Sequence, residues 1–288
     1  MLLNTRCEEC LLGRVEYECR LICDDEELIT KAVEGCRKRL EEIRDYSRPS
    51  PEIASELHRH ACFLISNPDP YEKIKTMNNR DAITLEKDIE GSLESLHDFC
   101  LAAAIGNTLD YGSMEHDVTE DLSGFFWNEY NKGFTVEDID RMEKLCKNIV
   151  FLCDNAGEIV FDRLLIRHLK KKGARVVVVV KKRPIINDAT MPDALSLGID
   201  RIADKVLTNT EDIAELGLNY SLISDELKEE IEKADLILAK GMANYESLSE
   251  IKKAVNLPPV LFLMMVKCEP IADDIKIPKG SRIAYLME

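Results

Sequence analysis

The sequence lacks long hydrophobic runs and is poor in basic residues relative to acidic ones. No apolar stretch approaches the ~20 residues that a membrane-spanning helix requires, so no such helix is predicted. Arg6, Glu8 and Glu9 interrupt the apolar start of the chain, which is not typical of a signal peptide. Lysine and arginine number 38 against 54 aspartate and glutamate, giving a net charge of −16. This charge disfavours binding to nucleic acid or to an anionic membrane. We therefore expect a cytoplasmic protein with neither partner.

Two further sequence features are missing from the chain. No G-x-G-x-x-G follows a predicted strand, which disfavours a dinucleotide site of the Rossmann type. No internal repeat or low-complexity tract is present. Ten cysteines occur in a protein expected to be cytoplasmic, so reduced thiols, metal ligands or buried side chains are favoured over a disulfide framework.

The chain of 288 residues changes character near residue 145. Before it, helical patterns dominate, and Pro51 is placed to open one of these helices. After it, short β-branched runs alternate with helical segments, a pattern typical of a parallel sheet covered by helices on both faces. The expected strands are 149–153, 175–180, 205–207, 235–239, 260–266 and 282–286. We therefore predict an α/β protein with a helical region 1–145 and a sheet domain 146–288.

Three of these strands are followed by polar turns that could form one site. The first turn contains Asp154 and Asn155, the second contains Asp188, and the third contains Lys240 and Asn244. In a parallel sheet such turns share one edge, where ligands bind. Carboxylate and amide oxygens suit a hard divalent cation, and a lysine suits an anionic substrate. Each turn alone is more simply explained as a helix cap or an ordinary loop, and it is the three turns at one sheet edge that favour a site.

The motifs resemble those of the metal-dependent damage-control phosphatase family, long known as domain of unknown function eighty-nine. The resemblance extends from about Cys7 to about Cys268. The cysteine pair at the start resembles the branch of the family with an N-terminal Cys-x-x-Cys. The matching segments are Cys7-x-x-Cys10, Gly106-Asn-Thr-Leu-Asp110, Asp154-Asn-Ala-Gly-Glu158, Asn187-Asp-Ala-Thr190, Lys240-Gly-x-x-Asn-Tyr-Glu246 and Lys267-Cys268.

The resemblance implies a three-layer α/β/α sandwich with a mostly parallel sheet, preceded by a helical part. It implies hydrolysis of small phosphate esters, such as sugar phosphates or damaged phosphorylated metabolites, with Mg, Mn, Co or Ni. The metal would be held by Asp154, Asn155 and Asp188, and Asp154 and Lys240 would be catalytic. The implied substrate-binding residues are Asn107, Asp110, Glu158, Asn187, Asn244, Tyr245 and Lys267.

The residues themselves bear on the mechanism. Phosphatases that form an aspartyl-phosphate often carry Asp-x-Asp at a strand end, but here the third position is Ala156. This favours water activated by the metal as the nucleophile.

Two alternatives stay open: a transferase using the same pocket, and a non-catalytic metal- or thiol-dependent binding protein. For the second, Cys7, Cys10 and Cys268 are the candidate thiol or metal cluster, with buried thiols as the simpler interpretation. The oligomeric state is left open.

Overall fold

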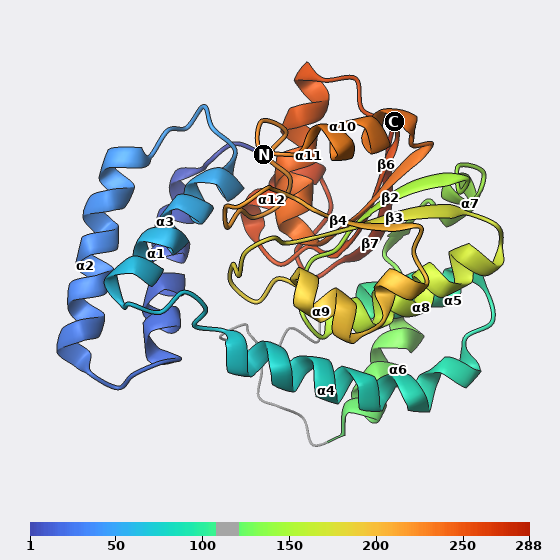
Figure 1. Ribbon diagram of the computed structural model, residues 1–288, viewed down its shortest axis with the longest axis horizontal. Helices are drawn as coiled ribbons and strands as arrows, with labels where there is room; N and C mark the ends of the chain where they lie inside the picture. Colours follow the sequence, from blue (N-terminus) through green and yellow to red (C-terminus); the bar gives the residue numbers. More distant parts are fainter. Residues whose placement is uncertain (108–120) are drawn as a thin grey trace.

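The computed structural model describes residues 1–107 and 121–288 and shows a sheet between two helical layers, with a helical bundle beside it (Figure 1). Many helices begin at a side chain that caps their free N–H groups. Asn4, Asp25 and Ser224 do so for three of them, and Ser95 forms a capping box with Asp98. The α-helices are α1 (Thr5–Arg20), α2 (Glu26–Ile43), α3 (Ser50–Leu64), α4 (Glu72–Ile89), α5 (Leu96–Gly106), α6 (Leu122–Lys132), α7 (Ile139–Glu143), α8 (Glu158–Lys171), α9 (Met191–Ser196), α10 (Asp225–Lys233), α11 (Gly241–Ala254) and α12 (Glu269–Ile275).

The strands form one sheet in the order β1-β7-β6-β5-β2-β3-β4. They are β1 (Val136–Glu137), β2 (Asn148–Leu152), β3 (Arg175–Val180), β4 (Lys205–Thr208), β5 (Leu236–Lys240), β6 (Val260–Met265) and β7 (Arg282–Met287). All neighbouring pairs are parallel except β6 with β7. The α/β fold with a mostly parallel sheet, predicted from the sequence, is confirmed. The short strand β1 was not predicted.

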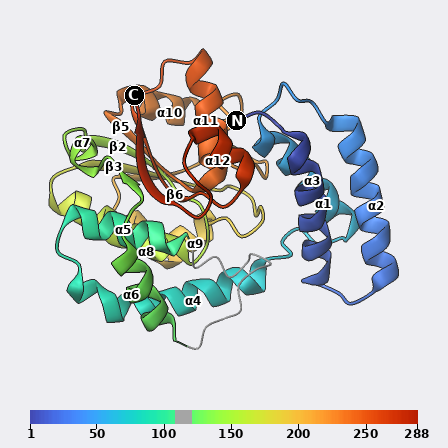
Figure 2. The same ribbon diagram turned by 180° about the vertical axis from the view of Figure 1, so that it is seen from behind.

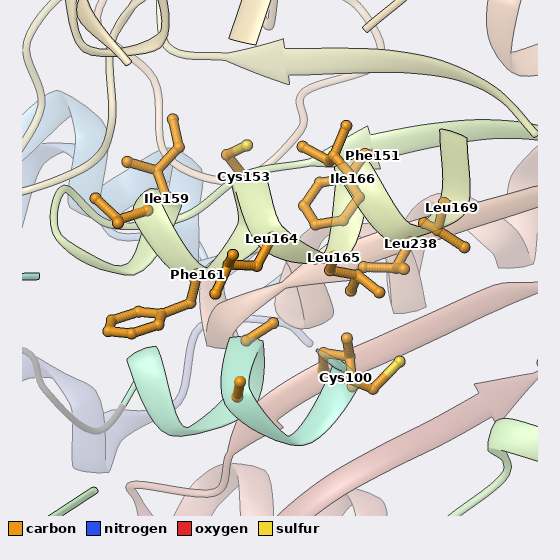
Figure 3. Close-up of a cluster of buried hydrophobic side chains, with 14 of the residues drawn as sticks. Cys100, Phe151, Cys153, Ile159, Phe161, Leu164, Leu165, Ile166, Leu169 and Leu238 are labelled. Carbon is orange, nitrogen blue, oxygen red and sulfur yellow. The ribbon is translucent and has the colours of Figure 1, made fainter. Parts of the chain in front are cut away.

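Alternate residues of each strand pack against opposite helical layers. In β2, Ile149 and Phe151 join the cluster that contains α5 and α8, whereas Val150 and Leu152 join the cluster that contains α10 and α11. Figure 3 shows the first cluster, with Phe161 and other apolar side chains of α8 packed between the strands and α5. The sheet is therefore buried on both faces, which accounts for its unbroken apolar runs.

The described helices before residue 145 contribute to two different hydrophobic clusters. Helices α1, α2 and α3 enclose a hydrophobic core of their own and stand to one side of the sheet in both views (Figures 1 and 2). Helices α4, α5 and α6 instead contribute Leu85, Leu101 and Phe126 to the cluster beneath the sheet. The bundle contacts the rest of the molecule through α3, where Arg59 pairs with Glu215 at 2.9 Å, and through α1, where Arg6 pairs with Asp273 at 2.8 Å. In the part of the chain described, none of the helices has the length and apolar character to cross a membrane.

Candidate functional site

The predicted site lies where the sheet reverses its direction of growth. β2 and β5 are neighbours; the chain moves outward from β2 to β3 and β4, and from β5 to β6. Helix α8, which follows β2, covers one face, and α11, which follows β5, covers the other. The carboxyl ends of β2 and β5 therefore lie between the N-termini of α8 and α11. Ligands of open α/β sheets bind at this switch point, and helix N-termini favour negative charge.

Asp154 lies at this switch point, directly after β2. Its Oδ2 accepts hydrogen bonds from Asn107 Nδ2 at 3.1 Å and from Asn155 Nδ2 at 2.9 Å. Burial raises the pKa of Asp154 well above its ordinary value, and the charges of Glu158 and Asp188 raise it further. The positive charges of Lys267 and Lys181 act in the opposite direction. The site therefore concentrates acidic side chains that repel one another.

Two neighbouring turns bring Asn155 and Asp188 to the same place. The two residues form an isolated antiparallel bridge. The backbone N–H of Ala189 donates to the carbonyl of Asp154 at 2.7 Å, and that of Ala156 donates to the carbonyl of Asn187 at 2.9 Å. These backbone hydrogen bonds thus hold the turns after β2 and β3 against each other. This places Asp154, Asn155 and Asp188 in one buried group.

The donor set of this group fits a hard divalent cation. Two carboxylates and an amide are oxygen ligands of the kind that magnesium and manganese accept. Asn155 uses its Nδ2 on Asp154 and Glu158, so its Oδ1 is directed away from these carboxylates. Across residues 1–107 and 121–288, no three His, Cys, Asp or Glu side chains are grouped to hold a metal ion. A cation here would therefore depend on the amide as well as on the two aspartates.

Lys240 is placed differently from a side chain that reaches out to a substrate. It is fully buried, and its Nζ donates to Glu158, to Asp162 at 2.8 Å and to the carbonyl of Ala103 at 2.9 Å. Glu158 in turn accepts from Asn107 at 2.9 Å. Lys240 therefore holds Glu158 beside Asp154 and neutralises part of the buried negative charge. In this arrangement, a contact with phosphate would require it to give up one of three partners.

Replacing Lys240 with methionine should strongly destabilise the fold, because Glu158 and Asp162 would remain buried without their cation. We expect the free energy of unfolding to fall by about 3–5 kcal/mol, measured by urea denaturation. The matched control is Lys233→Met, since Lys233 forms an exposed pair with Glu229 at 3.0 Å, where the cost is about 0–1 kcal/mol. Equal losses in the two variants would contradict the role assigned to Lys240.

The other expected substrate-binding residues fall into three situations. Asn107 and Glu158 belong to the hydrogen-bonded group around Asp154, and Lys267 is half-buried and acts on the charge of Asp154. Asn187 lies in the turn paired with the Asp154 turn. The side chains of two residues form hydrogen bonds elsewhere. Asn244 donates to the carbonyls of Cys153 and Lys240 at the ends of β2 and β5, and the hydroxyl of Tyr245 donates to Asp274 on α12 at 2.8 Å. Asp110 lies outside the described residues.

Two residues of the site were missed by sequence reasoning. Asp162 stands one helical turn after Glu158 on α8, a spacing that could have signalled a shared partner. Burial raises the pKa of Asp162 to about 7 despite the charge of Lys240. Asn79 of α4 accepts a hydrogen bond from the backbone N–H of Gly157 at 2.7 Å. No local pattern points to Asn79, because its partner is distant in sequence.

The cysteines of the predicted cluster come from two separate elements. Cys7 and Cys10 lie on α1, and Cys268 immediately precedes α12. Burial raises the pKa of Cys268 to about 11, and the nearby charges of Glu246, Cys7 and Cys10 add to this shift. The three thiols are thus neighbours. The three sulfur atoms are not grouped to bind a metal ion in this structure.

The chain is similar to several known proteins over nearly its whole length. A family model described as the damage-control phosphatase ARMT1-like domain matches residues 3–283. A protein of Archaeoglobus fulgidus named damage-control phosphatase is 39% identical, and the match covers 100% of both chains. Damage-control phosphatase PH1575 of Pyrococcus horikoshii is 30% identical over 98% of this chain and 97% of its own. A crystal structure of a DUF89 family protein from Pyrococcus horikoshii matches with a TM-score of 0.89 at 26% identity, covering 99% of this chain and 98% of that one.

These relatives support a phosphatase role for the chain, consistent with an acidic site at the switch point of an α/β sheet. The extent of the match and the identity of the relatives show the family directly. The chain belongs to the damage-control phosphatase ARMT1-like family, also known as domain of unknown function eighty-nine.

Proposed function

We propose that this chain hydrolyses phosphate monoesters of small metabolites with a divalent cation held by Asp154, Asn155 and Asp188. The observation that carries the proposal is the crowding of acidic side chains around Asp154, whose pKa is raised by burial and by the charges of Glu158 and Asp188. A cation between these oxygens would offset their repulsion. Phosphatase relatives that match the full length of the chain support the same activity.

The residues of the site would have different roles in this reaction. A bound divalent cation would polarise the phosphoryl group and lower the pKa of a water molecule. Asn107 and Asn155 direct their amide N–H groups at Asp154, which orients the carboxylate. Lys240 donates to Glu158 and so holds this second acidic side chain in place. Lys267 is half-buried near Asp154 and is better placed than Lys240 to meet the phosphate of a substrate.

The first test is phosphatase activity of the chelated protein on p-nitrophenyl phosphate, with magnesium, manganese, cobalt and nickel added separately. We expect activity to return with at least one of these metals. A parallel melting experiment should show stabilisation by the same metal, about 2.7 kcal/mol at a concentration 100 times the dissociation constant. Full activity in the chelated protein would contradict the metal dependence. Stabilisation without hydrolysis of p-nitrophenyl phosphate would instead favour a binding protein.

We also propose that the chain belongs to the family branch with an N-terminal Cys-x-x-Cys. The proximity of Cys7 and Cys10 to Cys268 supports a thiol cluster that links α1 to α12, beside the ion pair of Arg6 with Asp273 at 2.8 Å. Cobalt addition distinguishes the forms of this cluster. Thiolate-to-cobalt absorption that disappears in Cys268→Ser would indicate a metal site. No such absorption in the wild type would indicate a cluster of thiols that binds no metal.

A further inference from the structure

The helical bundle contains a chain of three polar side chains that the proposed phosphatase site does not use. Cys62 and His58 lie one turn apart on α3, and Sγ of Cys62 is 3.4 Å from Nε2 of His58. On the other side of the ring, Nδ1 of His58 is 3.0 Å from Oε1 of Glu18 on α1. A thiol, an imidazole and a carboxylate are therefore aligned in the order found around nucleophilic cysteines.

Burial makes the carboxylate and the imidazole depend on each other. Glu18 is 1% exposed and His58 is 3% exposed. Oε2 of Glu18 has no hydrogen-bond partner within the described residues, so the ring of His58 is the group that compensates this carboxylate. Burial alone would lower the pKa of His58, but the charge of Glu18 and the hydrogen bonds to Cys62 and Glu18 raise it to about 10. The ring is thus protonated at neutral pH and has an N–H on each side.

The protonated ring gives Cys62 a distinctive environment. With Nδ1 donating to Glu18, Nε2 donates to the sulfur of Cys62, so a cationic N–H lies directly against the sulfur atom. Cys62 is half-buried. Cys146 is also half-buried, but its Sγ donates to the carbonyl of Met142 at 3.3 Å and burial raises its pKa to about 12. Cys146 therefore offers a comparison of similar exposure, with its sulfur bonded to a backbone carbonyl and not to an imidazole.

We infer that Cys62 is a nucleophilic thiol and a covalent modification site for small electrophiles, with His58 and Glu18 as its positioning residues. With an alkyl halide, the sulfur forms the new S–C bond while the carbon–halogen bond breaks, halide leaves and the thiol proton passes to water. With hydrogen peroxide as oxidant, the S–O bond forms as the O–O bond breaks. Sulfur then loses two electrons, and the products are the sulfenic acid and water.

The experiment measures the alkylation rate of each cysteine in the full chain, with iodoacetamide under pseudo-first-order conditions and site-resolved peptide mass spectrometry. Cys10 is exposed and serves as the internal reference, and Cys146 is the half-buried comparison. We expect Cys62 to react about tenfold faster than Cys10 at neutral pH, although it is less accessible. A Cys62 rate at or below that of Cys10 would overturn the inference.

Three variants separate activation from simple exposure. His58→Gln and Glu18→Gln should each slow alkylation of Cys62 about tenfold without changing the rate at Cys10. His60→Gln is the matched control, because His60 lies on the same helix and stacks on Phe63. Its Cys62 rate should equal that of the wild type. Unchanged rates in both His58→Gln and Glu18→Gln would refute the positioning role. If either variant fails to fold, the wild-type comparison of Cys62 with Cys10 still decides.

Discussion

Replacing Asp154 with asparagine should abolish metal-dependent phosphatase activity and, at the same time, stabilise the metal-free protein. The loss of activity should be about 100-fold or more, as for removal of other groups that stabilise a transition state electrostatically. The gain in stability follows from the buried charge. Burial raises the pKa of Asp154, and the charges of Glu158 and Asp188 raise it further. An uncharged amide of similar size removes this repulsion.

The two effects are measured on the same samples. Without metal, relief of about 1 kcal/mol would raise the melting temperature by roughly 2–4 °C for a chain of this size. The wild type should then gain stability when metal is added, whereas Asp154→Asn should not. Asp235→Asn is the matched control, since Asp235 lies at the opposite edge and accepts from Asn148 Nδ2 at 2.8 Å. Undiminished hydrolysis by Asp154→Asn would exclude this residue from the catalytic group.

Replacing Gly241 with alanine should also destroy the site, although this glycine carries no chemistry of its own. Its φ is +74°, and an added Cβ would lie 1.9 Å from Oδ2 and 2.2 Å from Cγ of Asp154. Because Gly241 begins α11 at the end of β5, neither the backbone nor the carboxylate can move away without disturbing the site. We expect activity to be lost, and the free energy of unfolding to fall by about 3 kcal/mol, at the upper end of local backbone strain.

The control for Gly241 is another glycine with positive φ in open space. Gly173 has φ of +90°, and nothing lies within 4 Å of a Cβ added there. Gly173→Ala should cost about 1–2 kcal/mol from the backbone conformation alone, with activity unchanged. Comparing urea denaturation and hydrolysis rates of the two variants isolates the collision with Asp154. Similar losses of stability and activity would mean that backbone strain, and not the collision, determines both.

Much of the fold could be predicted because its signals are local. The strand predicted at 175–180 corresponds to β3, whose valines pack into the clusters on both faces of the sheet. The polar turns after three strands predicted a shared edge, since strands of a parallel sheet end at the same side. The placement of Asp154, Asn155 and Asp188 beside one another agrees with that expectation, and their metal-binding role stays a prediction. β1 was missed because two residues carry too short a pattern to recognise.

The sequence by itself determined the class of this protein: periodicity and turn residues specify strands, helices and their alternation, and the motifs specify the family. Only the tertiary structure decided which charges meet. Lys240 was expected at the substrate, yet it is paired with Glu158 and Asp162. Likewise, the alignment of Cys62 and His58 with Glu18 joins two helices of the bundle. The physical reason is that hydrophobic patterning acts over a few residues, whereas buried ion pairs join residues that are distant in the chain and depend on the packing of whole elements.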